Sequence, residues 1–290
     1  MRHRGWWKAG LAMALVLAVS ACASRPPPPS ADAVQHLPPW RARIAAAALA
    51  EWQAWGQLTV DGWPDTLARE PDPRLFDRIL TYWAAVPGEG ALIIRRHQDT
   101  HDALLAGLQD SVAEPAAFGA PPPTTATATA TVPLPSISLW AYPAWSAAFI
   151  SHVMATAGVP SFTFTPAAAH AQYIDNLLWQ ADSNPDQAPF RPHAPADYAP
   201  QPGDLLCADR SRSPLLHWQD RLAEGGQFRP MHCDVVVASG GGLVQAIGGN
   251  VRDATVLRRF PADAQGRALP PPYDKPPFML VLENRLDQGR

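Results

Sequence analysis

Apolar residues recur every three or four positions in several parts of the chain, and this spacing predicts amphipathic helices. The alanine-rich first stretch is also favoured by helix propensity, and the fourth is entered at Pro143 and closed by Gly158. The predicted helices cover residues 40–55, 73–85, 98–112, 144–158 and 167–179.

After residue 202 the pattern changes to short runs rich in Val, Leu, Ile and Phe, which predict β-strands. These runs cover residues 204–208, 233–238, 243–247, 255–260 and 278–282. The glycines at 240–242 predict a hairpin turn between two of the strands. Helices followed by an antiparallel run of strands favour the α+β class.

Composition divides the chain into five segments. A basic start, a ten-residue apolar run and small residues make residues 1–21 a predicted signal peptide, too short to span a bilayer. A proline-rich tether (22–38) leads to a helical N-terminal region (39–118). A low-complexity Pro/Thr loop (119–135) then precedes the α+β core (136–290).

The residues Val19-Ser20-Ala21-Cys22 resemble the lipobox of bacterial lipoproteins. This resemblance implies cleavage before Cys22, acylation of its thiol and attachment to a lipid bilayer. Because no Asp follows the cysteine, we expect the outer membrane at its periplasmic face rather than the inner membrane. The alternative is an ordinary secretory signal in which the cysteine occurs by chance.

Charge and cysteine content narrow the possibilities further. Loss of residues 1–21 removes three basic residues (Arg2, Arg4 and Lys8), so the net charge changes from −3 to −6. No basic stripe suited to nucleic acid is present. If Cys22 is acylated, Cys207 and Cys233 remain, and in an oxidising compartment they form either one disulfide or two buried thiols.

Four short motifs occur in a characteristic order. Trp-Ser-Ala-Ala-Phe-Ile-Ser (145–151) begins a predicted helix, and Pro-Gly-Asp-Leu-Leu (202–206) leads into a strand. His-Cys-Asp (232–234) begins the next strand, and Ile-Gly-Gly-Asn-Val (247–251) ends the one after it.

This order resembles the NlpC/P60 and CHAP group of papain-like cell-wall hydrolases over about residues 136–260. The resemblance implies a core of one helix packed on an antiparallel sheet, preceded here by a helical extension. The whole chain is similar to a bacterial lipoprotein family, domain of unknown function 2272. His170 followed by Tyr173 and the Tyr82-Trp83 helix also fit that second family.

Ser146 stands where the papain-like group has its catalytic cysteine. A serine hydroxyl is much less acidic than a thiol, so catalysis would require His232 as a general base. Asn250 would orient His232, and Asp234 is a rival because it shares the face of His232 on an alternating strand. Cys233 would point the other way, toward Cys207. Alternatively, the Ser146 hydroxyl only satisfies amide groups at the start of the helix, and Asn250 is only a turn residue.

Three further residues are candidates to line the cleft. Trp145 precedes the serine, and His170 and Tyr173 lie three positions apart on a predicted helix. His170 has the alternative role of a hydrogen-bonded core histidine. His152 is expected to point away from Ser146 because six residues rotate a helix by about 600°.

The sequence predicts no metal, nucleotide or other cofactor. His97 and His101 lie four positions apart with Asp102 alongside, but a solvated helix face explains them better than a metal site. The expected function is cleavage or transfer at amide bonds of peptidoglycan. The alternative is a non-catalytic lipoprotein that binds a partner protein or ligand of the cell envelope.

Overall fold

The computed structural model describes residues 38–117 and 133–288. The predicted signal peptide, the lipidation site Cys22, and nearly all of the proline-rich tether and the Pro/Thr loop lie outside the described residues. In the described part, no helix is both long enough and apolar enough to cross a membrane.

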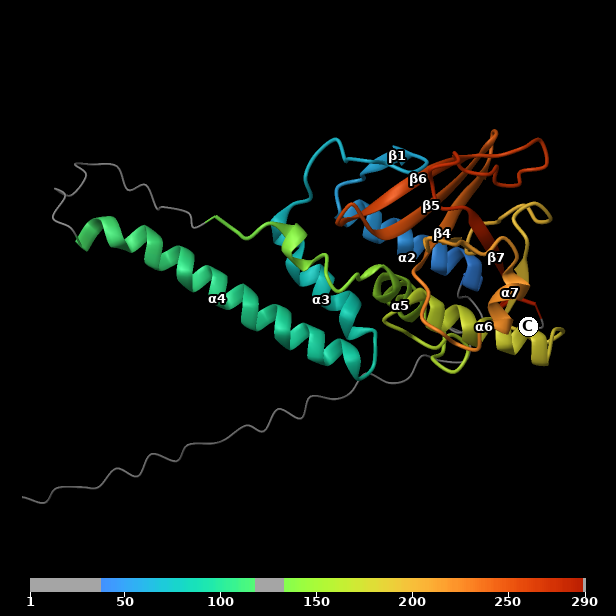
Figure 1. Cartoon of the computed structure of the whole chain (residues 1–290), viewed down its shortest axis with the longest axis horizontal. Coiled ribbons are helices and arrows are strands. Elements are labelled where there is room, and N and C mark those ends of the chain that lie inside the picture. The colour runs from blue at the N-terminus through green and yellow to red at the C-terminus, as the bar shows by residue number, and fades with distance from the viewer. Residues whose placement is uncertain (1–37, 118–132, 289–290) are drawn as a thin grey trace, which may run out of the picture. The chain divides into compact units, whose positions relative to one another are not determined.

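All five predicted helices are present (Figure 1). They are α2 (Trp40–Ala54), α3 (Phe76–Ala84), α4 (Glu89–Ala117), α5 (Ser146–Thr156) and α6 (His170–Ser183). The 3₁₀ turns η1 (Pro73–Leu75) and η2 (Ile137–Trp140) precede α3 and α5. Helix α4 begins well before the predicted residue 98, because Pro87 and Gly88 break the chain and Ile93 then packs into the core. The sequence missed α7 (Trp218–Ala223), which is too short to show a period.

The described strands form one seven-stranded sheet with the order β1-β6-β5-β4-β3-β7-β2. They are β1 (Thr59–Asp61), β2 (Phe190–His193), β3 (Leu205–Asp209), β4 (Met231–Gly240), β5 (Leu243–Val251), β6 (Ala254–Pro261) and β7 (Phe278–Asn284). Only the β1–β6 pair is parallel. The predicted α+β class is confirmed. The two edge strands β1 and β2 were missed because three or four residues carry too little pattern.

Helices α2 and α5 pack on one face of the sheet, against β4 and β5 (Figure 1). Side chains of α2, α3, α5 and α6 share a single hydrophobic core with the inward side chains of the strands. Helices α2 and α3 therefore belong to the same core as the later α+β elements.

The opposite face of the sheet carries a second, smaller cluster. Leu206, Val236 and Phe260 belong to it, and Trp63 covers them. Successive side chains of a strand point to opposite faces, so the two clusters indicate the direction of each side chain in β4. Cys233 and Val235 face the helices, whereas His232, Asp234 and Val236 face the other side.

Cys207 and Cys233 lie directly opposite each other on β3 and β4 and form a disulfide. Both are fully buried on the face that packs against the helices. Their Cα atoms are 4.1 Å apart, slightly closer than the roughly 4.4–6.8 Å usual for a bridge. The distance agrees with a closely spaced cross-strand pair.

The Pro-Gly-Asp turn attaches helix α2 to the sheet. Asp204 is fully buried, and Arg41 of α2 donates a hydrogen bond to it at 2.6 Å. The backbone amides of Gln201 and Asn284 donate two more. Burial raises the pKa of Asp204 even though Arg41 acts in the opposite direction. Gly203 has a φ of +87°, and a Cβ there would lie 2.7 Å from the Arg41 Cα, so the helix needs a glycine at this contact.

The disulfide predicts a measurable contribution to stability. It closes a loop with a sequence separation of 26, for which the loss of chain entropy in the unfolded state corresponds to about 3–4 kcal/mol. Reduction with dithiothreitol, or the double substitution Cys207→Ala and Cys233→Ala, should lower the free energy of unfolding in urea by about this amount. The reductant should not affect the double variant. An unchanged unfolding midpoint after complete reduction would contradict the prediction.

Candidate functional site

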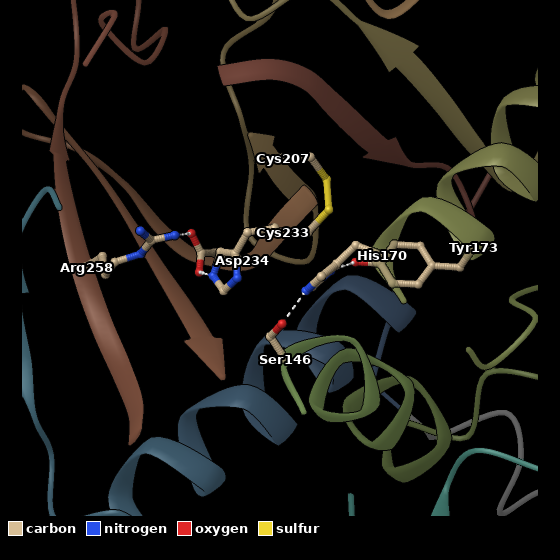
Figure 2. The surroundings of a disulfide bond; sticks show 8 residues. Ser146, His170, Tyr173, Cys207, Cys233, Asp234 and Arg258 are labelled. Atoms are coloured by element: carbon tan, nitrogen blue, oxygen red, sulfur yellow. Dashed lines mark hydrogen bonds and ion pairs between the residues drawn. A yellow bond between two sulfur atoms is a disulfide. The ribbon is translucent and has the colours of Figure 1, made fainter. Parts of the chain in front are cut away.

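Ser146 is the first residue of α5, and its side chain contacts a histidine rather than the helix backbone. Its Oγ lies 2.7 Å from Nε2 of His170, the first residue of α6 (Figure 2). The alternative role, in which this hydroxyl binds amide groups of the first turn, is not seen, since His170 is its one hydrogen-bond partner among the described residues. The start of α5 thus presents a paired hydroxyl and imidazole.

His170 is held from its other side by Tyr173, one turn later on α6. Its Nδ1 lies 2.5 Å from the Tyr173 hydroxyl. Burial lowers the pKa of His170 well below its usual value, and the neighbouring His232 acts in the same direction. The imidazole is therefore neutral, with one nitrogen donating and the other accepting. When Nδ1 donates to Tyr173, Nε2 accepts from Ser146; the other tautomer reverses both bonds.

A second polar chain runs outward along the sheet through His232, Asp234 and Arg258. His232 Nε2 donates to Asp234 at 3.1 Å, and Arg258 of β6 donates to the other carboxylate oxygen. Figure 2 shows Asp234 pointing away from the disulfide toward Arg258. Burial acts to raise the pKa of Asp234, but Arg258 and His232 hold it down at about 2. Burial also lowers the pKa of His232 although Asp234 opposes this shift.

Arg258 is fixed by aromatic rings as well as by its ion pair. Its guanidinium carbon lies 4.3 Å from the ring centroid of Trp63 and 5.0 Å from that of Phe260. Such contacts favour a cation over an aromatic face. The charged end of a buried arginine is therefore held in one place beside Asp234.

The two hydrogen-bonded groups of side chains lie beside each other, but no hydrogen bond joins Ser146 to His232. The rings of His170 and His232 lie 5.2 Å apart between centroids. The Ser146 hydroxyl therefore pairs with His170 rather than with the expected His232. The reason is strand alternation: Cys233 faces the helices, so His232 and Asp234 face the other side of the sheet.

Asn250 does not orient His232. Its side-chain amide donates to the carbonyl oxygen of Ala141 at 3.0 Å, and its φ is +55°. Asn250 lies within β5, where the pairing with β6 shifts register between Gly248 and Val251, and asparagine tolerates this left-handed conformation. Asp234 performs the orienting role instead.

The two glycines before Asn250 are required by close contacts. A Cβ on Gly248 would lie 1.9 Å from Asp234 Oδ1 and 2.9 Å from His232 Nε2. A Cβ on Gly249 would lie 2.5 Å from Phe149 Cβ on α5. Gly248 therefore allows the His232–Asp234 pair to form, and Gly249 allows α5 to lie against β5.

An open cavity of about 380 Å³ lies beside the second chain. Four cationic side chains contribute to its wall, together with His232 and Asn250. Ser146, His170, Tyr173 and Trp145 are not among the residues that line it. The cavity therefore lies beside His232 and not around Ser146, where the cleft was expected. Trp145, His170 and Tyr173, which were predicted to line that cleft, are buried.

Trp145 belongs to an aromatic cluster behind the site. It stacks on Trp55 at 5.3 Å between centroids and packs against Tyr82. The Tyr82 hydroxyl donates to the buried Glu51 and accepts from the Trp55 indole. His152 contacts the same carboxylate at 3.3 Å, so it points away from Ser146 as expected. Burial acts to raise the pKa of Glu51, but His152, Tyr82 and Arg78 lower it.

The histidines of α4 are not on a solvated face. His97 is buried against Trp140, and His101 stacks on Phe76 with 4.4 Å between centroids. They pack there because α3 and Trp140 of η2 cover this side of α4. The spacing of residues 98–112 alone did not indicate this contact. Within residues 38–117 and 133–288, no group of three or more His, Cys, Asp or Glu side chains is arranged to hold a metal.

The sequence interpretation missed Arg258 and Arg210, which line the cavity. A signal for Arg258 was present, because it lies two positions before Phe260 and so shares the face of an apolar residue on an alternating strand. Glu51, the one acidic residue of α2, was a similar signal for the aromatic cluster.

Gly248→Ala should separate His232 from Asp234, because the added methyl would overlap the carboxylate. Displacing the carboxylate also disturbs its buried ion pair with Arg258. Breaking a buried ion pair typically costs 3–5 kcal/mol, so we expect the free energy of unfolding to fall by about 3 kcal/mol or more. Gly107→Ala on α4 is the matched control, since nothing lies within 4 Å of its added Cβ. Urea unfolding of both variants tests this, and equal stability of the two would contradict the contact.

The chain matches a bacterial family described as "Uncharacterized protein conserved in bacteria (DUF2272)" over residues 114–285. No curated protein and no solved structure matches it. The matched range contains both polar chains but leaves α2 and α3 outside it. Because the match covers more than half of the 290 residues, the chain belongs to the DUF2272 family.

Proposed function

We propose that this protein is a hydrolase or transferase of amide bonds in which Ser146 is the nucleophile and His170 the general base. The observation that carries the proposal is the 2.7 Å contact between Ser146 Oγ and His170 Nε2, with Tyr173 on the other ring nitrogen. A nucleophile paired with a base that a third group orients is the usual arrangement for covalent catalysis.

The reaction would begin with the tautomer in which His170 Nδ1 donates to Tyr173. The free Nε2 removes the hydroxyl proton as Ser146 Oγ attacks the carbonyl carbon. The oxygen anion that forms lies near the first amides of α5, whose partial positive charge stabilises it. The proton on Nε2 then passes to the leaving amine, and water or a second amine releases the acyl group from Ser146. The lowered pKa of His170 leaves the imidazole unprotonated at neutral pH, as a base must be before it accepts a proton.

The order of elements supports a distant relationship to papain-like hydrolases. A nucleophile at the start of a helix is followed by the Pro-Gly-Asp strand and then by β4, whose second residue is His232. His232 and Asp234 would occupy the places of the histidine and its orienting residue. In this chain the base would be His170 from α6, and His232 would act on the substrate from the cavity side.

The sequence at Cys22 supports a position on the outer membrane, facing the periplasm. A domain tethered there by acyl chains reaches peptidoglycan, whose peptide stems contain amide bonds. We therefore propose peptidoglycan as the substrate.

A second candidate function is binding without cleavage, and the burial of the Ser146 side chain favours it. Ser146 is 6% exposed, and the open cavity lies beside His232 instead. In this case the domain would hold a peptide or protein of the cell envelope in a site that has lost its thiol.

Ser146→Ala should reduce cleavage of purified peptidoglycan at least a hundredfold, because it removes the nucleophile. The comparison is made by zymography and muropeptide analysis of wild type, Ser146→Ala and Ser161→Ala, an exposed serine that serves as the matched control. Activity that survives in Ser146→Ala would exclude this serine as the nucleophile. An inactive wild type together with an active Ser146→Cys would favour the binding function.

Cys22→Ser should abolish the lipid anchor, because the hydroxyl cannot replace the thiol in lipoprotein acylation. We expect the variant to lose incorporation of labelled palmitate and to move from the membrane fraction to the soluble fraction of the cell envelope. Continued labelling of the variant would place the lipid elsewhere or rule out this anchor.

A further inference from the structure

The cavity beside His232 has the chemistry of an anion site. We propose that it binds an oxyanion group of a ligand, a carboxylate or a phosphate, through Arg210, Arg258 and His232. This inference goes beyond the catalytic proposal and does not need Ser146 to be a nucleophile.

The wall of the cavity carries more positive than negative side chains. Arg210, Arg252, Arg258 and Lys275 outnumber the acidic Asp65 and Asp253. Lys275 and Arg252 both pair with Asp65, at 3.0 and 3.7 Å, and Arg258 pairs with Asp234 behind the wall.

Arg210 is the wall cation for which the described part of the chain supplies no anionic partner. Its guanidinium makes no ion pair or side-chain hydrogen bond within residues 38–117 and 133–288, and its backbone amide donates to Pro230. Desolvation at the wall lowers its pKa, and the positive charges of Arg258 and Arg252 lower it further. Arginine remains charged despite such shifts, so the repulsion stays until an anion offsets it.

Two buried nitrogen atoms at the cavity wall also lack hydrogen-bond partners among the described residues. His232 Nδ1 and Arg258 Nε are buried and have no hydrogen-bond partner among the described residues. Both side chains are at least nine-tenths buried, and both residues line the cavity. Buried polar atoms without partners are rare in folded proteins, and a bound ligand is a standard explanation.

The side chains of the site are held in place, and the cavity has the size of a small-ligand site. Trp63 and Phe260 hold the Arg258 guanidinium, and Asp234 fixes both Arg258 and His232. Preorganised groups lose little entropy on binding. A volume of about 380 Å³ falls within the range usual for small-ligand sites, roughly 300–1,000 Å³. Guanidinium groups match carboxylate and phosphate oxygens in geometry.

The test is isothermal titration calorimetry of the whole chain with succinate, with inorganic phosphate, and with neutral succinamide. We expect saturable binding of succinate or phosphate and none of succinamide, with the tighter of the two anions indicating the ligand class. A wild type that binds neither anion at millimolar concentration would overturn the proposal.

Substitutions assign the binding to this cavity. Arg210→Gln should weaken it at least fivefold, and Arg210→Lys should restore most of the affinity. Arg212→Gln, an exposed arginine two residues away that does not line the cavity, should bind as wild type does. Unchanged affinity in Arg210→Gln, with thermal unfolding showing that the variant is folded, would overturn the assignment.

Anion binding can be tested separately from catalysis by Ser146. Ser146→Ala should bind the same anion as tightly as wild type, because Ser146 is not part of the cavity wall. Absence of peptidoglycan cleavage would therefore contradict the catalytic proposal and leave the anion site unaffected. Absence of anion binding would overturn the anion site and would not bear on Ser146 as the nucleophile.

Discussion

The cross-strand pair of Cys207 and Cys233 sets the direction of every neighbouring side chain in β4. Because both sulfurs lie on the helix-facing side, His232 and Asp234 must lie on the opposite side. A one-residue change of register would bring the charged pair into the hydrophobic core and expose the sulfurs. The disulfide and the packing of the helices on this face thus oppose the register shift. The hydrogen-bonded group of Ser146 and that of His232 therefore remain on opposite faces of the sheet.

The buried charges on the outer face depend on one another. Asp234 is held as an anion by Arg258 and His232, and Arg258 is held by two aromatic rings. An isolated buried charge would be costly, whereas a charge with several fixed partners is tolerated. Gly248 makes the arrangement possible because any larger residue would occupy the position of the Asp234 carboxylate.

Helices outside the family match also contribute to the fold. Arg41 of α2 neutralises the buried Asp204 at the start of β3, and α2 and α3 supply part of the same core as α5. Glu51 and Tyr82 form a hydrogen-bonded cluster beneath Trp145, the residue that precedes Ser146. The position of Ser146 is therefore supported from elements on both sides of the matched boundary at residue 114.

The sequence alone was sufficient for features that depend on local pattern. Periodicity indicated the five longer helices and the five central strands, and alternation along β4 indicated that Cys233 and His232 face opposite ways. The motifs also directed attention to Ser146, His170, His232 and Asp234. Tertiary structure alone decided which histidine contacts Ser146, because α6 brings His170 across 24 residues to the start of α5. It likewise decided that Asn250 lies at a register shift of β5 and binds Ala141, and that Arg210 and Arg258 line a cavity. Contacts between separate elements depend on packing and leave no periodic pattern in the sequence.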